Sequence, residues 1–139
     1  MRAKKMIWKY KGSDLTELPE EVVGFVYILH YEDDFYYIGK KLARSLVRRK
    51  PLVGMRKNAK RMVWTEHKWR EYEGSSDYTD DHTLVAKEIV FLCKTKAAMT
   101  YMETDLQFRT SCLVDDKSLN YSILGKFYRR SIIDGIYDA

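Results

Sequence analysis

Two short apolar runs on either side of an acidic stretch constrain the fold of this chain more than any other feature. The runs cover residues 25–29 and 36–40, and three consecutive acidic residues, 32–34, lie between them. Strand, polar turn and strand in this order are typical of an antiparallel β-hairpin. We therefore predict one hairpin that carries Tyr27 on its first strand and Tyr37 on its second.

The length of the turn decides whether the two tyrosines share a face of the sheet. Directly opposed residues of an antiparallel pair point to the same side. A two-residue turn at 33–34 would put Tyr27 and Tyr37 on opposite faces, whereas a three-residue turn at 32–34 pairs Tyr27 with Gly39 and brings both hydroxyls to one face. We predict the three-residue turn. Because Gly39 has no side chain, it would leave room beside Tyr27 for a ligand or another backbone.

Charge is strongly segregated along the chain, although the net charge of +5 is modest. Residues 40–70 hold twelve Lys or Arg against one acid, Glu66, and residues 71–88 hold six acids against Lys87 alone. Such segregation is typical of proteins that bind a polyanion, nucleic acid above all, and a solvated basic loop is the alternative. We expect residues 42–63, which a proline and a glycine interrupt, to combine a short helix with a surface loop.

A buried strand and a capped helix are predicted in the second half of the chain. The apolar run 89–93 is typical of a central strand, and Thr95 is a candidate N-cap for a helix over residues 96–109. Glu103 occupies the same helical stripe as three apolar residues, Met99, Met102 and Leu106. A carboxylate at this position indicates that it faces a cleft or binds a cation. The alternative is that it lies at the edge of the stripe and pairs with a nearby Lys or Arg.

The order of these elements resembles the GIY-YIG nuclease superfamily over residues 24–120. Phe25-Val26-Tyr27 stands where the family has Gly-Ile-Tyr, without the glycine next to the tyrosine, and Tyr37-Ile38-Gly39 keeps the second motif intact. The resemblance implies an α+β fold in which a small central antiparallel sheet, the hairpin plus a third strand, is flanked by helices. The basic run 48–52 is most similar to that of freestanding, homing-like nucleases of tailed bacteriophages.

The resemblance also implies which residues form the site. The expected catalytic residues are Tyr27, Tyr37, Arg48, Glu103 and Asn120, and the expected substrate-binding residues are Gly39, Lys40, Lys41, Arg44 and Arg49. The family's arginine follows the Tyr-Ile-Gly glycine on a helix. Arg48 comes nearest in spacing, and Arg44 and Arg49 are the alternatives.

The implied reaction is metal-dependent hydrolysis of a DNA phosphodiester. Glu103 would hold Mg²⁺ or Mn²⁺, Arg48 would stabilise the charge that develops on the phosphate, and Asn120 would brace the glutamate or the phosphate. Water could be activated by a metal-bound hydroxide or by Tyr27 or Tyr37 as a phenolate. The phenolate requires a pKa below about 10, which the charge of a nearby lysine would favour.

Length and composition bound the remaining expectations. We expect one nuclease domain, residues 24–127 with a basic insertion at 42–76, between an extension at 1–23 and a tail at 128–139. Two isolated cysteines and the lack of a membrane-length apolar run fit a cytoplasmic protein without a membrane partner, in a bacterial host cell if phage-encoded. A homodimer is one way to cut both DNA strands. Two alternatives are a non-catalytic nucleic-acid-binding protein on a degenerate nuclease fold and a nuclease specific for branched DNA.

Overall fold

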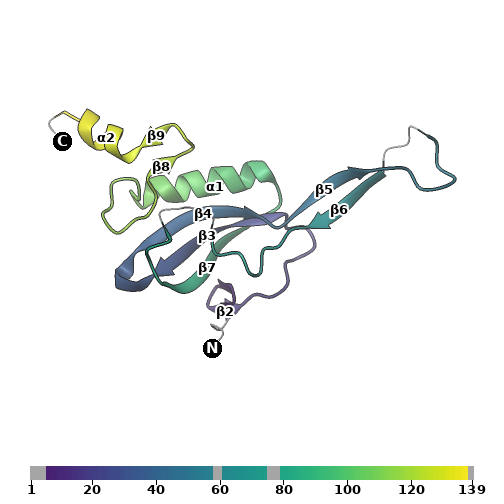
Figure 1. The fold of residues 1–139 in the computed structure, drawn as a ribbon, viewed down its shortest axis with the longest axis horizontal. Coiled ribbons are helices and arrows are strands. Elements are labelled where there is room, and N and C mark those ends of the chain that lie inside the picture. The colour runs from purple at the N-terminus through teal and green to yellow at the C-terminus, as the bar shows by residue number, and fades with distance from the viewer. Residues whose placement is uncertain (1–5, 58–60, 75–78, 138–139) are drawn as a thin grey trace.

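The computed structural model describes residues 6–57, 61–74 and 79–137, and its centre is a five-stranded sheet in the order β2-β1-β7-β3-β4 (Figure 1). The long strands are β3 (Gly24–Tyr31), β4 (Tyr36–Leu42) and β7 (Leu84–Cys93). Two short strands, β1 (Lys9–Tyr10) and β2 (Ser13–Asp14), extend the sheet beyond β7. All neighbours are antiparallel except β1 and β7. The expected α+β class with a mostly antiparallel sheet is confirmed.

The predicted hairpin has the predicted register. The turn η1 (Glu32–Asp34) joins β3 to β4, and Asp33 and Asp34 both have positive φ values, of 62° and 64°. Aspartate tolerates this left-handed region better than most residues because its short polar side chain can bond locally. Tyr27 pairs with Gly39, so the three-residue turn is confirmed and both tyrosines lie on one face of the sheet.

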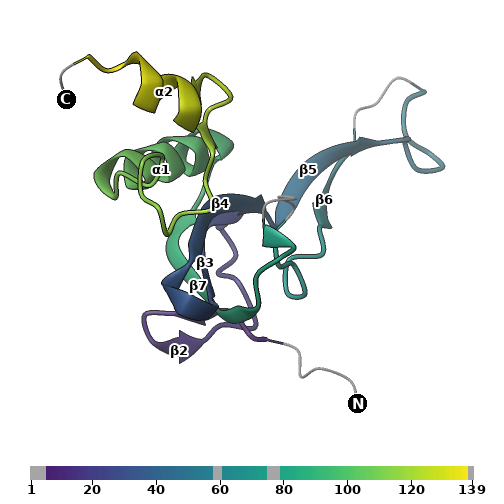
Figure 2. The same ribbon diagram turned by 60° about the vertical axis from the view of Figure 1, so that its left-hand side comes forward.

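The two faces of the sheet pack against different partners. One face carries Phe25 and Tyr27, which are at most 1% exposed and pack with the equally buried indoles of Trp8 and Trp69. Trp8, which was assigned to an N-terminal extension, is therefore part of the core. The other face is covered by helix α1 (Lys96–Arg109), as Figure 2 shows.

Helix α1 has the predicted bounds and the predicted cap. The Thr95 side chain accepts a hydrogen bond from the backbone N–H of Ala98, which satisfies one of the unpaired donors of the first turn. Met99, 3% exposed, packs against Val26 of β3 and Cys93 of β7. The helix is therefore held against the sheet through the apolar stripe that the sequence indicated.

The basic segment after β4 does not form the expected helix and loop. It forms a second antiparallel hairpin, β5 (Arg44–Arg49) with β6 (Arg61–Glu66), which projects from the body of the molecule (Figures 1 and 2). We call β5, β6 and the described residues between them the arm. The expectation of a helix was wrong because cross-strand pairing, such as that of Val47 with Val63, stabilises an extended backbone that the charge pattern did not reveal.

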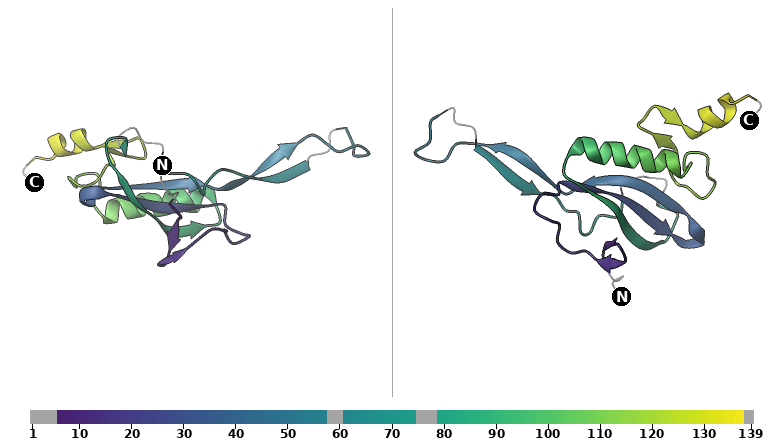
Figure 3. Two further views of the ribbon diagram at one scale, coloured as in Figure 1. Left: turned by 60° about the horizontal axis from the view of Figure 1, so that its bottom comes forward. Right: turned by 180° about the vertical axis from the view of Figure 1, so that it is seen from behind.

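The C-terminal segment packs beside α1 (Figure 3). It contains the short strands β8 (Ser122–Ile123) and β9 (Phe127–Tyr128), followed by helix α2 (Arg129–Gly135). The Arg129 guanidinium donates hydrogen bonds to main-chain carbonyls of the preceding loop, among them those of Ser118 and Asn120, at 2.9 and 3.0 Å. No helix in the described ranges has both the length and the apolar character needed to cross a bilayer.

Candidate active site

The two hairpin tyrosines meet a third one on the aromatic face of the sheet. The rings of Tyr27 and Tyr37 lie 6.5 Å apart, centroid to centroid, and the ring of Tyr72 stands edge-on to Tyr27 at 5.9 Å. Tyr27 and Tyr72 also share a side-chain hydrogen bond. Sequence reasoning gave Tyr72 no catalytic role, because only the irregular segment between Trp69 and Gly74 brings it back over the sheet.

The Tyr27 side chain fills the space beside Gly39, so the room for a ligand that we expected there is absent. A Cβ atom at position 39 would lie 2.5 Å from the Tyr27 hydroxyl oxygen and 2.7 Å from the ring carbon that carries it. The space that the missing side chain leaves is therefore filled by the phenol itself. Any larger residue at this position would displace the Tyr27 hydroxyl.

Both phenols hold their protons more tightly than free tyrosine does. Burial raises the pKa of Tyr27 far above its ordinary value, with smaller contributions from Tyr72 and Glu103. Burial, followed by the charge of Glu103, raises the pKa of Tyr37 to about 12. The expected lowering by a nearby lysine is absent at both residues. Desolvation disfavours the phenolate, and the lysines are engaged elsewhere.

The two lysines after Gly39 point to opposite faces of β4. Lys40 lies on the α1 side, where its ammonium donates a hydrogen bond of 2.7 Å to the Thr100 hydroxyl. The ammonium of Lys41 lies on the aromatic side, 4.7 Å from the centre of the Tyr72 ring. Because successive residues of a strand alternate in direction, one cation faces each side of the edge strand.

Glu103 is a partly buried residue of α1, the helix that covers the face of the sheet opposite to the tyrosine rings. Burial raises the pKa of its carboxyl, and the charge of Lys40 partly offsets this rise. The Glu103 charge contributes in turn to the raised pKa of Tyr27 and Tyr37. Helix α1 packs against β4, the edge strand that carries Tyr37.

Metal-binding capacity in this region rests on Glu103. In residues 6–57, 61–74 and 79–137, no three His, Cys, Asp or Glu side chains are grouped as a ready-made metal site. Glu103 nevertheless suits a hard divalent cation, because carboxylate oxygens are the ligands that such ions take and no hydrogen bond or ion pair among the described residues occupies its side chain. The remaining ligands would have to be water and substrate oxygens.

Asn120 fixes the edge strand between the second tyrosine and the glycine. Its side-chain oxygen accepts a hydrogen bond from the Ile38 N–H, and its side-chain nitrogen donates one to the Ile38 carbonyl, both at 2.8 Å. The residue is 3% exposed. Both ends of the amide are thus engaged with β4, and Asn120 braces this strand instead of Glu103 or a phosphate.

A buried glutamine that the sequence did not single out supports the same peptide group. The Gln107 side-chain nitrogen lies 3.4 Å from the Ile38 carbonyl, which already accepts from Asn120. The Gln107 side-chain oxygen is buried without a hydrogen-bond partner in the structure. Only its position on the inner side of α1 could have indicated this role, and the apolar stripe does not include it.

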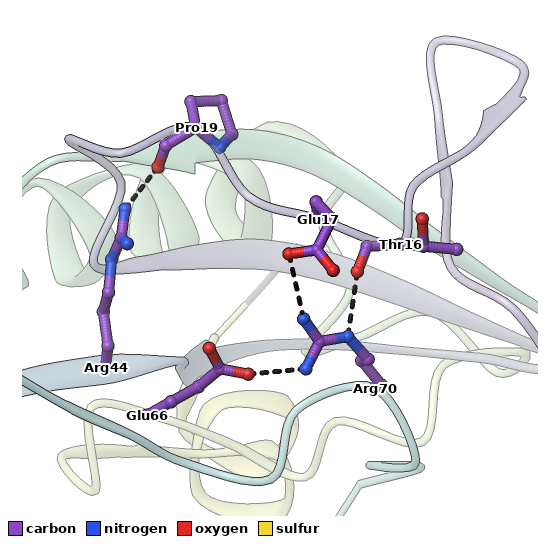
Figure 4. A network of polar contacts seen from close by, with 6 residues as sticks. All are labelled: Thr16, Glu17, Pro19, Arg44, Glu66 and Arg70. Atoms are coloured by element: carbon purple, nitrogen blue, oxygen red, sulfur yellow. Dashed lines mark hydrogen bonds and ion pairs between the residues drawn. The ribbon is translucent and has the colours of Figure 1, made fainter.

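The three candidate arginines lie outside the tyrosine cluster. Arg48 is an exposed residue of β5, nine residues beyond Gly39 along two nearly continuous strands, which at about 3.3 Å per residue is on the order of 25–30 Å. Arg44 donates hydrogen bonds to the carbonyls of Glu20, Val22 and Pro19, the last of which Figure 4 shows. The Arg49 guanidinium lies 3.3 Å from the Thr65 hydroxyl. The structure therefore brings Tyr27 and Tyr37 together on one face of the sheet, places Glu103 on the helix that covers the other face, and brings no candidate arginine to the tyrosines.

One of three comparisons with known proteins identifies the family of this chain. Neither a curated protein nor a solved structure matches the chain. A family model described as "Putative endonuclease segE, GIY-YIG domain" matches residues 8–132. The match begins at the buried Trp8, spans both tyrosine strands, the arm and α1, and ends within α2. The chain is therefore a member of the GIY-YIG endonuclease family and, like that family, a nuclease.

Proposed function

We propose that the chain is a metal-dependent DNA endonuclease that hydrolyses phosphodiester bonds at the β4 edge. The observation that carries this proposal is the match of the GIY-YIG endonuclease model to residues 8–132, and Glu103 supports it as a partly buried carboxylate on the helix that packs against β4. We infer that this acid and the two hairpin tyrosines act at one phosphodiester. Phage origin, which the resemblance implied, and a homodimer, which cutting both strands suggested, stay predictions.

Glu103 would hold Mg²⁺ or Mn²⁺. A divalent cation beside it would offset the desolvation that raises the pKa of its carboxyl and would keep it ionised at neutral pH. When bound, such an ion supplies a Lewis acid for the leaving 3′-oxygen. With Gln in place of Glu the position keeps its size and loses the charge that this role requires.

The tyrosines act as proton-bearing groups in this proposal. Because both phenols are protonated at neutral pH, Tyr37 can donate a hydrogen bond to a phosphate oxygen or to the attacking water. Tyr27, which shares a hydrogen bond with Tyr72, would keep both side chains in place on the aromatic face of the sheet. A free phenolate base is disfavoured by burial, so the two tyrosines would hold their protons instead of removing one from water.

Positive charge at this site would come from lysine. Lys41 lies against Tyr72 on the aromatic side, and Lys40 faces Glu103. The catalytic role expected of Arg48 stays a prediction that this geometry does not favour, and we propose that Arg48 contacts the DNA backbone away from the scissile bond. Replacing Lys41 with Gln should then lower the cleavage rate more than replacing Arg48 with Gln.

A plasmid assay tests the proposed function. Wild type should convert supercoiled plasmid to nicked or linear forms with Mg²⁺ and not with EDTA. Glu103→Gln should lose at least about 100-fold in rate, as loss of a metal ligand or of a main electrostatic group does, while duplex binding persists. Asp105→Asn, an acid on the same helix paired with Arg109, is the matched control and should keep the wild-type rate.

Two outcomes would overturn the proposal. One is Glu103→Gln nicking as fast as wild type. The other is wild type that binds DNA but never nicks it with Mg²⁺ or Mn²⁺, which would support the alternative of a non-catalytic DNA-binding protein.

A further inference from the structure

The arm carries an uninterrupted positive charge on an exposed ribbon. Of its described residues between Ser45 and Thr65, six are Lys or Arg and none is acidic. Five of the six are exposed, namely Arg48, Arg49, Lys50, Arg56 and Lys57. Among the described residues, no hydrogen bond or ion pair occupies the side chains of Arg48, Lys50, Arg56 or Lys57. These four charges are therefore available to a polyanion.

The base of the arm is fixed to the body by polar contacts (Figure 4). Arg70 bonds the Thr16 carbonyl at 2.8 Å and pairs with both Glu17 and Glu66. Arg44 bonds three carbonyls of the preceding loop, at Pro19, Glu20 and Val22. Glu66, the single acid of β6, is thus neutralised at the base, and the outer part of the arm is left purely cationic.

One face of the arm is also apolar and exposed to solvent. Leu46 pairs with Trp64, and Arg48 pairs with Met62, so these four side chains share a face. Trp64 is 59% exposed, Met62 50% and Leu46 46%. The turn beyond β5 adds Leu52, at 58%, and the fully exposed Val53. Contiguous exposed apolar groups of this kind are typical of binding surfaces.

The shape of the arm fits the major groove of a DNA duplex. Strands of six residues extend about 20 Å, and a two-stranded ribbon is a width that the major groove admits. The apolar face with its indole is too bulky for the minor groove, which is only about 6 Å wide. Lys and Arg along both strands would then meet the phosphates on either side of the groove.

We propose that the arm binds duplex DNA in the major groove, with its cations on the flanking phosphates and the Trp64 face toward the bases. The proposal rests on the proposed function, because it takes the DNA substrate from it. A single residue, Ala43, separates the arm from β4, the strand that carries Tyr37. The arm would be a DNA-binding surface separate from the cleavage site. It could also recognise base sequence, since apolar side chains contact the thymine methyl group in this groove.

The first test is the salt dependence of binding, measured in EDTA on a fluorescent 30-base-pair duplex. Arg48→Gln/Arg56→Gln should lower the slope of log K against log salt by about 1.8, because each lost phosphate contact removes about 0.9. The matched control, Lys11→Gln/Lys126→Gln, removes the same charge from exposed sites outside the arm and should leave the slope unchanged. An unchanged slope for the arm variant would overturn the proposal.

The second test uses Trp64 as a reporter of the groove. Trp8 and Trp69 are 1% exposed, so acrylamide quenching of the free protein comes mainly from Trp64. Duplex DNA in EDTA should protect this fluorescence several-fold, netropsin in the minor groove should not reverse the protection, and uracil in place of thymine should weaken binding. Trp64→Phe provides the blank. Quenching that duplex leaves unchanged, or protection that netropsin abolishes, would overturn the assignment.

These tests separate the two proposals. Neither of them needs cleavage, so a protein that protects Trp64 but never nicks would retain the arm assignment and lose the nuclease assignment. A protein that cleaves with Mg²⁺ while the arm variants bind as wild type does would show the reverse.

Discussion

Two hairpins that follow each other in the chain have opposite environments. In the β3–β4 hairpin, both faces are covered, and Tyr27 is 1% exposed. In the arm, both faces meet solvent, and Trp64 is 59% exposed. The same backbone arrangement thus holds protonated phenols in a largely buried aromatic cluster in one case and presents cations and an indole to solvent in the other. Burial, and not the hairpin itself, decides which chemistry each can carry.

Removing one aromatic ring from each hairpin should give the largest contrast. Tyr27→Ala should cost about 3–5 kcal/mol of unfolding free energy, because a large buried ring is lost, whereas Trp64→Ala should change it by less than about 0.5 kcal/mol. Urea unfolding of both variants measures this. Tyr27→Phe is the control that keeps the packing. Equal losses of unfolding free energy for Tyr27→Ala and Trp64→Ala would show that Trp64 is packed in a core as Tyr27 is.

Removing the hydrogen bonds between Asn120 and β4 should give the next largest loss of stability. Asn120→Ala would leave both the N–H and the carbonyl of Ile38 without their strongest partner, at a cost of about 2–3 kcal/mol. Hydrogen exchange of the Ile38 amide should accelerate more than that of β3 amides. A variant with wild-type protection at Ile38 would contradict the bracing role.

A methyl group at one glycine of each hairpin sharpens the comparison further. Gly39→Ala forces its Cβ against the Tyr27 hydroxyl and should cost about 1–3 kcal/mol, with loss of cleavage. Gly54→Ala in the arm meets nothing within 4 Å, and its cost, about 1 kcal/mol, comes only from the positive φ of 93°. Thermal unfolding and the nicking rate measure both. Full activity in Gly39→Ala would disprove the role of the Tyr27 hydroxyl position.

The smallest expected effect is a dependence of stability on pH. Because burial raises the pKa of Glu103 in the folded state, the wild-type fold loses stability as pH rises from the ordinary carboxyl pKa to the raised one. Glu103→Gln should therefore melt a few degrees above wild type at pH 7, with a gap that shrinks toward pH 4. Thermal melts across this range measure the gap.

Asp115 provides a control of opposite sign. The Tyr36 hydroxyl donates to its carboxylate and lowers its pKa, so Asp115→Asn should melt below wild type at pH 7, and this deficit should fade as pH falls through the lowered pKa. A pH-independent gap for Glu103→Gln would mean that its carboxyl is not desolvated in the folded protein.

The parts of the fold that follow from local patterns were predictable from sequence. The acidic turn and the Tyr-Ile-Gly strand led to the register of β3 and β4, and Thr95 led to the start of α1, because turn length and capping act over a few residues. The arm was not predictable in this way. Its charges suit a helix, loop or ribbon equally well, and its strand pairing joins residues up to 22 positions apart, such as Arg44 and Glu66.

The chemistry of the site depended on packing that no local pattern contains. The raised pKa of Tyr37 results from burial on the aromatic face, and the engagement of Asn120 with Ile38 spans 82 positions in sequence. Tyr72 contacts Tyr27 from an irregular segment whose residue Trp69, three positions earlier, is buried in the same core cluster. The convergence of Glu103 with the tyrosines is implied by family resemblance and stays a prediction, which the packing of α1 against β4 supports.

The junction between the two hairpins has a mechanical consequence. Ala43 is the single residue between β4 and β5, it is completely buried, and its backbone N–H and carbonyl are both bonded, to Val23 and His67. The arm therefore joins the sheet without a flexible linker. A duplex bound by the arm would lie at a fixed distance from Tyr37. This distance would set the number of base pairs between the bound sequence and the cleaved bond.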